Sequence, residues 1–324
     1  MKALVCSTYG PIEGLRVEEV PAPAPGPGEV LLAVKLAGIS FPEALMVQGK
    51  YQVKPPLPFI PGSEIAGVVS ALGEGVTRFK VGERVFGRSH GNGGFAEQAL
   101  AEERALWRIP DELGSEAGMG MLNYATSLLA LRERAALKSG KTLLVLGASG
   151  GVGITAVEIG KMMGARVIAC ASTAEKLETC RRYGADELVN YEQEDLRAAI
   201  KRLTGDRGVD VVYDAVGDRF AEPAVRGMAW NGRYLVIGFA AGEVPKIALN
   251  LPLLKGCSIV GVYTGGAMQR DPQLARRLGD QLLGWIAAGK LKPLVTSRYP
   301  LERAVDALRD LLERRVQGKA VIEF

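Results

Sequence analysis

The chain has 324 residues, of which 48% are hydrophobic and 23% charged, and its formal net charge is +4. This length predicts two domains, and the composition is that of a globular protein with ample apolar residues for a core. The 40 Lys and Arg residues are interleaved with 36 Asp and Glu, so no basic stretch indicates a nucleic-acid partner. Apolar runs are shorter than the about 20 residues of a membrane span, and no signal peptide precedes them. We therefore expect a soluble, cytoplasmic protein without a nucleic-acid or membrane partner.

Four cysteines and one histidine limit the possible chemistry. Cys6, Cys170, Cys180 and Cys257 form no CxxC pair, which favours reduced and mostly buried thiols. His90 is the only histidine. A His-rich metal site, and any mechanism that needs two imidazoles, are therefore excluded.

Short apolar runs separated by Pro- and Gly-rich turns fill the first third of the chain. Runs at 30–34, 65–69 and 84–86 predict strands. Few helical periods occur before residue 115, whereas residues 116–134 are compatible with a helix. The first domain is therefore expected to be rich in β-structure.

Strand and helix patterns alternate strictly from residue 142 onward. Short apolar runs predict strands at 142–146, 166–170, 187–189, 209–213, 233–237 and 258–262. Helical patterns lie between most of them, at 152–163, 173–183, 193–203 and 220–230. Repeated βα units of this length predict an α/β fold with a doubly wound parallel sheet. Two amphipathic helices, near 273–288 and 301–314, and a strand at 320–324 end the chain.

A glycine-rich turn follows the first of these strands directly and leads into a helix. It reads Gly147-Ala148-Ser149-Gly150-Gly151-Val152-Gly153. In the A-x-G-x-x-G register, Ala148, Gly150 and Gly153 match a dinucleotide fingerprint. Glycine lets the backbone approach a diphosphate, and a helix N-terminus offers it unpaired N–H groups. We expect the diphosphate to be bound by Ser149, Gly150, Gly151, Val152 and Gly153.

The same turn also satisfies the G-x-S-x-G pattern of a hydrolase, with Ser149 as the nucleophile. That mechanism needs a histidine base after the serine. The only histidine, His90, lies upstream in a Gly-rich loop. A dinucleotide site is therefore the better interpretation.

The residues after the second strand of the alternating region indicate which dinucleotide is bound. NAD-specific sites place an acidic residue there to hold the ribose 2′-hydroxyl. Here Ala171 ends the strand, while Ser172 offers a hydrogen bond and Lys176 a positive charge one turn later. These groups suit the 2′-phosphate of NADP, so NADPH is the expected cofactor. The alternative is that Ser172 caps a solvated helix.

Several segments in the right order give the whole chain a resemblance to a known family. They read PGPGEV from residue 25, AGISF from 37, GKY from 49, PFIPGSEIAG from 58, GGFAE from 93, GASGGVG from 147, GVDVVYDAVG from 208 and GKAVI from 318. With these segments the chain resembles the zinc-free quinone oxidoreductase branch of the medium-chain dehydrogenase/reductase superfamily.

The resemblance implies a GroES-like β-rich catalytic domain, residues 1–122 and 264–324, and a Rossmann cofactor domain, residues 123–263, with the active site in the cleft. Zinc-dependent relatives place a Cys at the position of Ser40 and a His at that of Ser63, and neither serine is a good zinc ligand. No metal is therefore expected.

The resemblance also assigns individual positions to the cofactor. Thr126 matches a threonine near the nicotinamide ribose, and Lys176 with Tyr191 matches the pair that flanks the 2′-phosphate. Gly238 and Phe239 match the loop beside the nicotinamide.

Tyr51 and Ser40 are the expected catalytic residues of the substrate cleft, with Tyr51 the best donor to a carbonyl oxygen. Ser40 replaces an Asn that is frequent in the branch. The implied reaction is hydride transfer from NADPH to a quinone or a similar electron-poor carbonyl. A double-bond reductase of enones or enoyl thioesters and a non-catalytic, crystallin-like NADPH-binding protein remain as alternatives. Relatives imply a homodimer or homotetramer joined through residues 258–262.

Overall fold

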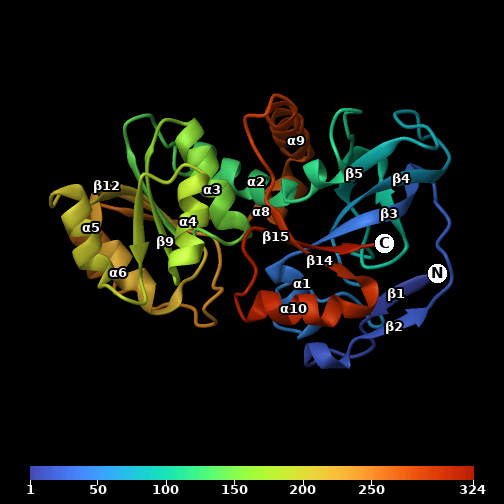
Figure 1. Cartoon of the computed structure of the whole chain (residues 1–324), viewed down its shortest axis with the longest axis horizontal. Coiled ribbons are helices and arrows are strands. Elements are labelled where there is room, and N and C mark those ends of the chain that lie inside the picture. Colours follow the sequence, from blue (N-terminus) through green and yellow to red (C-terminus); the bar gives the residue numbers. More distant parts are fainter. The chain divides into compact units, whose positions relative to one another are not determined.

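The computed structural model describes all 324 residues, and their contacts divide the chain into two compact units (Figure 1). Unit 1 comprises Met1–Leu122 and Gly279–Phe324, and unit 2 comprises Asn123–Leu278. The domain limits predicted from sequence differ from these units in residues 264–278, which lie in unit 2. These residues form α8 (Thr264–Arg270) and the beginning of α9 (Pro272–Ala287). Their helical pattern fits either domain, so the sequence alone could not assign them.

Unit 2 is built on a sheet of six parallel strands in the order β10-β9-β8-β11-β12-β13. The strands are β8 (Thr142–Leu146), β9 (Arg166–Ala171), β10 (Glu187–Asn190), β11 (Val209–Asp214), β12 (Met228–Val236) and β13 (Ser258–Gly261). Within this sheet, the first strand in the sequence is β8, in the middle. The next two strands, β9 and β10, lie on one side of it, and β11, β12 and β13 follow on the other side. The predicted doubly wound sheet is thus confirmed, with its change of direction between β8 and β11.

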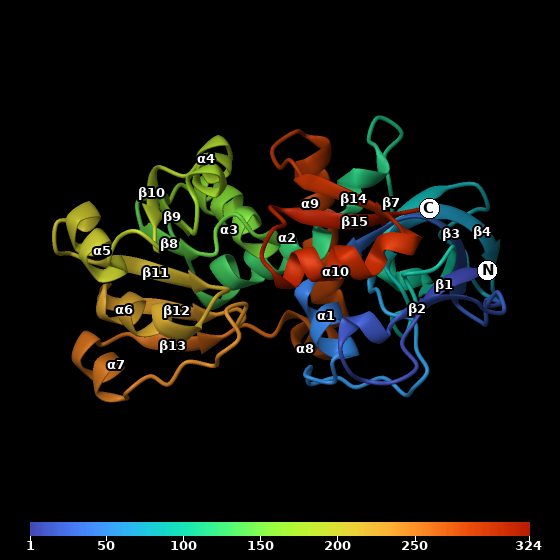
Figure 2. The same ribbon diagram turned by 60° about the horizontal axis from the view of Figure 1, so that its bottom comes forward.

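Helices cover both faces of this sheet. They are α3 (Gly151–Met162), α4 (Ala174–Arg182), α5 (Leu196–Thr204), α6 (Ala221–Arg226) and α7 (Asn250–Lys255). Helices α5, α6 and α7 lie side by side on one face, and α3 and α4 cover the other (Figures 1 and 2). Because both faces are covered, the central strands are mainly apolar, and Leu144, Ile168 and Val212 are fully buried.

The predicted helix at 220–230 is wrong in its second half. Helix α6 ends at Arg226, and β12 already begins at Met228. Gly227 lies so close to α5 that a Cβ there would stand 2.6 Å from Cδ1 of Ile200. Met228 is buried and pairs with Val209. Tertiary contact therefore ends the helix where the local sequence would allow it to continue.

Unit 1 contains a seven-stranded sheet in the order β14-β15-β3-β4-β5-β7, with β6 also paired to β3. Its strands are β3 (Glu29–Ile39), β4 (Glu64–Leu72), β5 (Arg84–Arg88), β6 (Gln98–Glu102), β7 (Leu106–Arg108), β14 (Val295–Pro300) and β15 (Lys319–Glu323). All neighbours are antiparallel except β14 and β15. A separate two-stranded sheet joins β1 (Lys2–Val5) to β2 (Arg16–Glu19). The predicted β-rich domain is confirmed.

Unit 1 also contains the helices α1 (Phe41–Val47) and α10 (Ala304–Leu312), which pack against each other. Helix α10 also packs against β14 and β15. Pro42 lies in the first turn of α1, where its missing N–H and fixed φ are tolerated. A helix of seven residues gives little periodicity, and for this reason α1 was not predicted.

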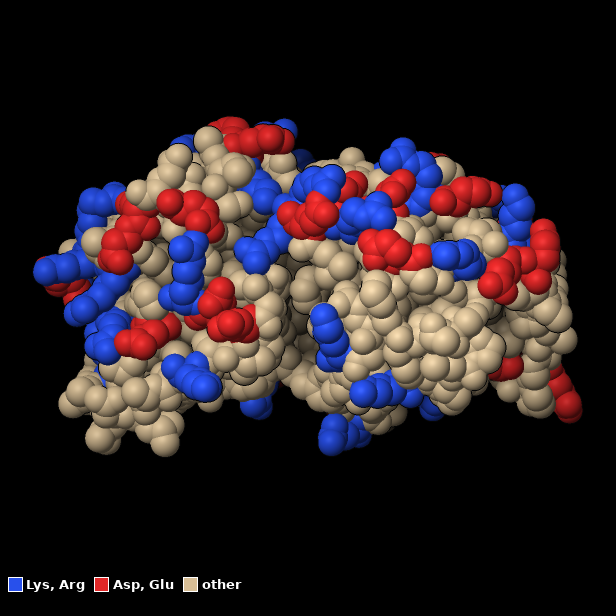
Figure 3. Space-filling view, turned by 90° about the horizontal axis from the view of Figure 1, so that it is seen from below, with Lys and Arg blue, Asp and Glu red and all other residues tan.

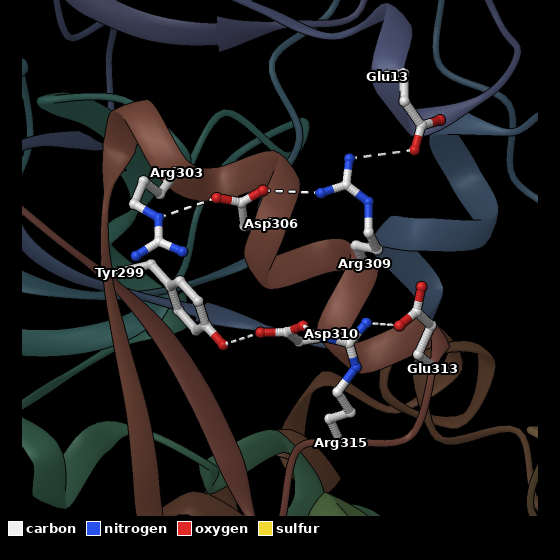
Figure 4. Close-up of polar contacts among 8 residues, drawn as sticks. All are labelled: Glu13, Tyr299, Arg303, Asp306, Arg309, Asp310, Glu313 and Arg315. Atoms are coloured by element: carbon white, nitrogen blue, oxygen red, sulfur yellow. Dashed lines mark hydrogen bonds and ion pairs between the residues drawn. The ribbon is translucent and has the colours of Figure 1, made fainter.

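Ion pairs cover the outer side of α10 (Figure 4). Asp306 lies 2.9 Å from Arg303 and 2.8 Å from Arg309, and Arg309 continues to Glu13 at 3.3 Å. These side chains are 38–63% exposed, and ion pairs in contact with water contribute little to stability. The alternating charges of this helix therefore form a solvated face.

The surface charges are mixed in sign. On the face drawn in Figure 3, lysines and arginines stand beside aspartates and glutamates rather than in a field of one sign. None of the helices combines the length and the apolar character needed to cross a membrane.

Candidate functional site

The glycine-rich turn closes tightly between β8 and α3. Gly147 has φ +70°, a conformation that strains other residues, and a Cβ there would lie 2.8 Å from Cγ2 of Val216. A Cβ on Gly153 would overlap the carbonyl oxygen of Gly147 and lie 2.8 Å from Cα of Ala148. The first turn of α3 therefore lies directly against the preceding loop.

The N-terminus of α3 fits the diphosphate of a dinucleotide. The N–H groups of Gly151, Val152 and Gly153 belong to the first turn of α3 and therefore have no intrahelical acceptor. The N-cap is Gly150, which has no side chain to accept from them. The nearest atom to a Cβ on Gly150 would be the Gly147 carbonyl oxygen at 3.4 Å. The space in front of this glycine is therefore open to an anion, which the helix dipole attracts.

The hydrolase interpretation of Ser149 lacks its base. The Ser149 residue is only 5% exposed. His90 is the only histidine; it belongs to unit 1, and its Nδ1 lies 2.5 Å from Oε1 of Glu29. No imidazole in unit 2 can activate this serine.

The residues that follow β9 match the chemistry of a phosphate site. Ala171 ends the strand and carries no acid, and Nζ of Lys176 donates to Oγ of Ser172 over 3.2 Å. The N-cap of α4 is Thr173, whose hydroxyl accepts from the Lys176 amide at 3.3 Å. The interpretation of Ser172 as a helix cap is therefore wrong. Its side chain instead faces the lysine.

Tyr191 reaches the same edge of the sheet from the next strand. Its amide donates to the carbonyl oxygen of Ala171 at 3.3 Å, so the backbones after β9 and β10 adjoin. The Tyr191 ring is half-buried, and its centroid lies 4.4 Å from that of Phe220. The structure thus brings Tyr191 to the strand end that precedes Ser172.

The predicted nicotinamide residues lie on two segments of unit 2, α2 and the loop after β12. Thr126 is on α2 (Met121–Leu128) and is half-buried. Gly238, after β12, donates its amide to the carbonyl oxygen of Asp214 at 3.3 Å. A Cβ on Gly217 would lie 2.9 Å from Cδ1 of Phe239, so the loops after β11 and β12 pack together.

Asp214 was not predicted from the sequence, yet it organises this part of the sheet edge. Its carboxylate accepts from the amides of Val216 at 2.7 Å and Gly217 at 2.8 Å, and Tyr234 donates to it through its hydroxyl. Burial raises the pKa of Asp214. The signal in the sequence was an acid at the end of the strand, directly after the apolar run Val211-Val212-Tyr213.

The two predicted catalytic residues lie before and after α1 in unit 1, with Ser40 as its N-cap and Tyr51 four residues beyond its last residue. The seven helical residues span about 10 Å. Ser40 is half-buried, and its Oγ accepts from Nζ of Lys319 at 2.7 Å. Tyr51 is half-buried and packs against the core of unit 1.

Beneath Ser40 lie three charged residues that were not predicted. Lys319 and Glu64 form an ion pair of 2.7 Å in which each side chain is 3% exposed. Glu43 is also buried, and Oγ of Ser63 donates to its Oε1 at 2.5 Å. Burial raises the pKa of Glu43. Glu43 interrupts an apolar run, whereas Glu64 and Lys319 each stand directly before one, and these positions are the signal that could have found them.

Comparisons with known proteins agree with this architecture. The family model described as "Alcohol dehydrogenase GroES-like domain" matches residues 26–111, and "Zinc-binding dehydrogenase" matches residues 151–279. A "Quinone oxidoreductase-like protein 2 homolog" of Nematostella vectensis is 38% identical over 92% of this chain and 82% of its own length.

Two solved structures, each described as complexed with NADPH, superpose over 100% of both chains with a TM-score of 0.93. One is a mycobacterial protein, 30% identical, and the other is the quinone oxidoreductase of Escherichia coli, 28% identical. The chain therefore belongs to the quinone oxidoreductase branch of the medium-chain dehydrogenase/reductase superfamily, and it is an oxidoreductase.

Proposed function

We propose that this protein is an NADPH-dependent reductase of quinones or similar electron-poor carbonyl compounds and that it works without a metal. The observation that carries the proposal is the Ser172–Lys176 pair at the end of β9, where no acid stands to repel a 2′-phosphate. When bound, NADPH supplies a hydride from C4 of its nicotinamide ring. The protein's own residues bind the cofactor and the acceptor, orient them, and stabilise the charge that forms on the acceptor.

In this proposal the residues of unit 2 hold the cofactor. The amides at the start of α3 bind the diphosphate, and Ser172, Lys176 and Tyr191 surround the 2′-phosphate. Thr126, Gly238 and Phe239 border the nicotinamide end. We add Asp214 to these cofactor residues. Its carboxylate fixes the turn at Val216 and Gly217, and the loop that carries Phe239 packs against this turn.

The residues of unit 1 bind the acceptor. Reduction places negative charge on an acceptor oxygen, and a hydroxyl that donates to this oxygen stabilises the charge. Ser40 and Tyr51 are the proposed donors. The anion of a reduced quinone is stable enough to take its proton from water, so no side chain has to transfer one.

Two features support a reaction without zinc. Ser40 and Ser63 offer hydroxyls, which are poor zinc ligands, and Oγ of Ser63 is already hydrogen-bonded to Glu43. Furthermore, the structure gathers no group of three or more His, Cys, Asp or Glu residues that could hold a metal ion.

Steady-state turnover tests the proposed function. We expect the purified protein to oxidise NADPH in the presence of 1,4-benzoquinone or 9,10-phenanthrenequinone, with unchanged rates after dialysis against EDTA. Faster turnover of a short enone would favour the double-bond reductase. Tight NADPH binding without turnover of any acceptor would favour the non-catalytic alternative.

We further propose a homodimer formed through β13. This strand is the edge of the sheet in unit 2, and its Ile259 is 41% exposed. Helix α7 lies near this strand (Figure 2). Its Leu253 is 76% exposed and its Leu254 is 71% exposed. An open strand edge with apolar neighbours favours pairing, and the same edge of a second copy is complementary to it about a two-fold axis.

A further inference from the structure

We propose that the buried Lys319–Glu64 pair is a positioning device that obliges Ser40 to donate its hydroxyl hydrogen to the acceptor oxygen. This inference rests on the proposed function and assigns a role within it to Ser40, Lys319 and Glu64.

Glu64 and Lys319 belong to β4 and β15, the two neighbours of β3, and Ser40 directly follows β3. Strand β15 pairs antiparallel with β3, with Ala320 opposite Ile39, so Lys319 stands opposite Ser40. On the other side of β3, Gly38 pairs with Glu64 of β4. The lysine side chain crosses over β3 at Gly38, where a Cβ would lie 2.6 Å from Cε of Lys319. Glycine at this position keeps the path to Glu64 open.

Glu64 fixes the lysine. One carboxylate oxygen lies 2.7 Å from Nζ of Lys319, and the other accepts from the amide of Leu122 at 3.1 Å. Both side chains of the pair are excluded from water, so each charge is compensated by the other rather than by solvent. The lysine is thereby held with Nζ 2.7 Å from Oγ of Ser40.

The ammonium decides what the Ser40 hydroxyl can do. A protonated lysine has three donors and no acceptor, so Ser40 must accept from it and must point its own hydrogen elsewhere. Ser40 also occupies the N-cap of α1, where a serine hydroxyl ordinarily accepts from the helix, yet its side chain makes no such bond. Its contact with Lys319 is the only side-chain hydrogen bond that Ser40 makes.

Ser63 provides the contrast. Its Oγ lies 2.5 Å from Oε1 of the buried Glu43, so its hydrogen is directed into unit 1. Of the two serines, only Ser40 has a hydrogen left for an acceptor oxygen that becomes negative during reduction. A donor placed before the reaction stabilises that charge without reorganisation.

Three substitutions at Ser40 separate donation from shape. Asn and Asp are isosteric and both accept from Lys319, but only Asn also has hydrogens to donate. We expect Ser40→Asn to keep kcat for 1,4-benzoquinone within about threefold, and Ser40→Ala and Ser40→Asp to lower it about 10- to 100-fold. The dissociation constant for NADPH and the unfolding midpoint should stay near those of the wild type. Full activity of Ser40→Ala, or equal activity of the Asn and Asp variants, would overturn the role of Ser40.

The role of the pair is tested by a double-mutant cycle. Removing Lys319 alone would leave Glu64 charged and buried, so Lys319→Met is combined with Glu64→Gln. We expect kcat of the Lys319→Met, Glu64→Gln double variant to be several-fold lower than that of the wild type. Adding Ser40→Ala should lower kcat less in this double variant than in the wild type. Equal costs in both backgrounds would show that the pair is only structural. Wild-type protein that binds NADPH but reduces neither quinone nor enone would instead overturn the proposed function itself.

Discussion

In the proposed function, Lys176 is the residue on which the choice of cofactor depends most. Its ammonium lies 3.2 Å from Oγ of Ser172, and loss of a charge-assisted hydrogen bond to phosphate costs ~1.5–3 kcal/mol. We therefore expect Lys176→Ala to raise the dissociation constant for NADPH about 10- to 100-fold and to leave that for NADH nearly unchanged. Quenching of protein fluorescence measures both constants. Lys201→Ala, an exposed lysine of α5, is the control, and an equal effect of Lys176→Ala on both nucleotides would refute a phosphate contact.

Glu43 makes the stability of unit 1 depend on pH. Burial raises the pKa of the Glu43 carboxyl in the folded chain. As the pH rises above about 4.5, this carboxyl therefore loses its proton in the unfolded chain before it does so in the folded chain. The free energy of unfolding then falls by up to ~1.4 kcal/mol per pH unit until the raised pKa is reached. Nearby Lys319 opposes this shift and Glu64 adds to it.

Glu43→Gln removes that titration. We expect its free energy of unfolding to decline less than that of the wild type between pH 4.5 and pH 7, by on the order of 1 kcal/mol. Urea unfolding at several pH values measures the difference, with the exposed Glu112→Gln as a control. Parallel profiles for the wild type and Glu43→Gln would contradict a carboxyl that resists ionisation.

The contacts of individual residues could be predicted where the partners are close in the sequence. Ser172 and Lys176 lie one helical turn apart, so their proximity follows from spacing. Glu64 and Lys319 are distant in the chain and meet only because β15 and β4 both adjoin β3. No local pattern carries that pairing, and the roles assigned to all these residues stay predictions.

At the scale of elements, two glycines of one turn have separate tasks. A methyl group on Gly153 overlaps the backbone of the preceding loop, whereas one on Gly150 meets only the Gly147 oxygen at 3.4 Å. We expect Gly153→Ala to lower the free energy of unfolding by about 1–3 kcal/mol.

Gly150→Ala should change stability by no more than ~1 kcal/mol but weaken NADPH binding at least ~10-fold, because its methyl group occupies the approach of the diphosphate. Denaturant unfolding and NADPH titration of both variants give the comparison. Undiminished NADPH affinity in Gly150→Ala would place the diphosphate elsewhere.

The elements of unit 2 were largely predictable because each strand contains a short run of apolar residues and turns separate the strands from the helices. The strand predicted at 142–146 coincides with β8. The predicted helix at 220–230 failed because contact between Gly227 and α5, rather than a local signal, ends α6. Short elements such as α1 and α7 carry too few residues for a period to appear.

At the scale of the whole molecule, the oligomeric state in solution tests whether β13 forms the proposed dimer interface. Ile259→Arg places a charge on β13, and we expect it to convert a dimer into a monomer by light scattering. Val81→Arg is the matched control, since Val81 is an exposed valine of unit 1 at 63%. A wild-type monomer, or an unchanged mass for Ile259→Arg, would refute the proposed interface.

The whole account depends on a phosphorylated dinucleotide bound to unit 2. Isothermal calorimetry of the purified protein with NADPH and with NADH tests this most directly. We expect one nucleotide per chain, with NADPH bound at least ~10-fold more tightly than NADH. Association with neither nucleotide, or a preference for NADH, would contradict the account.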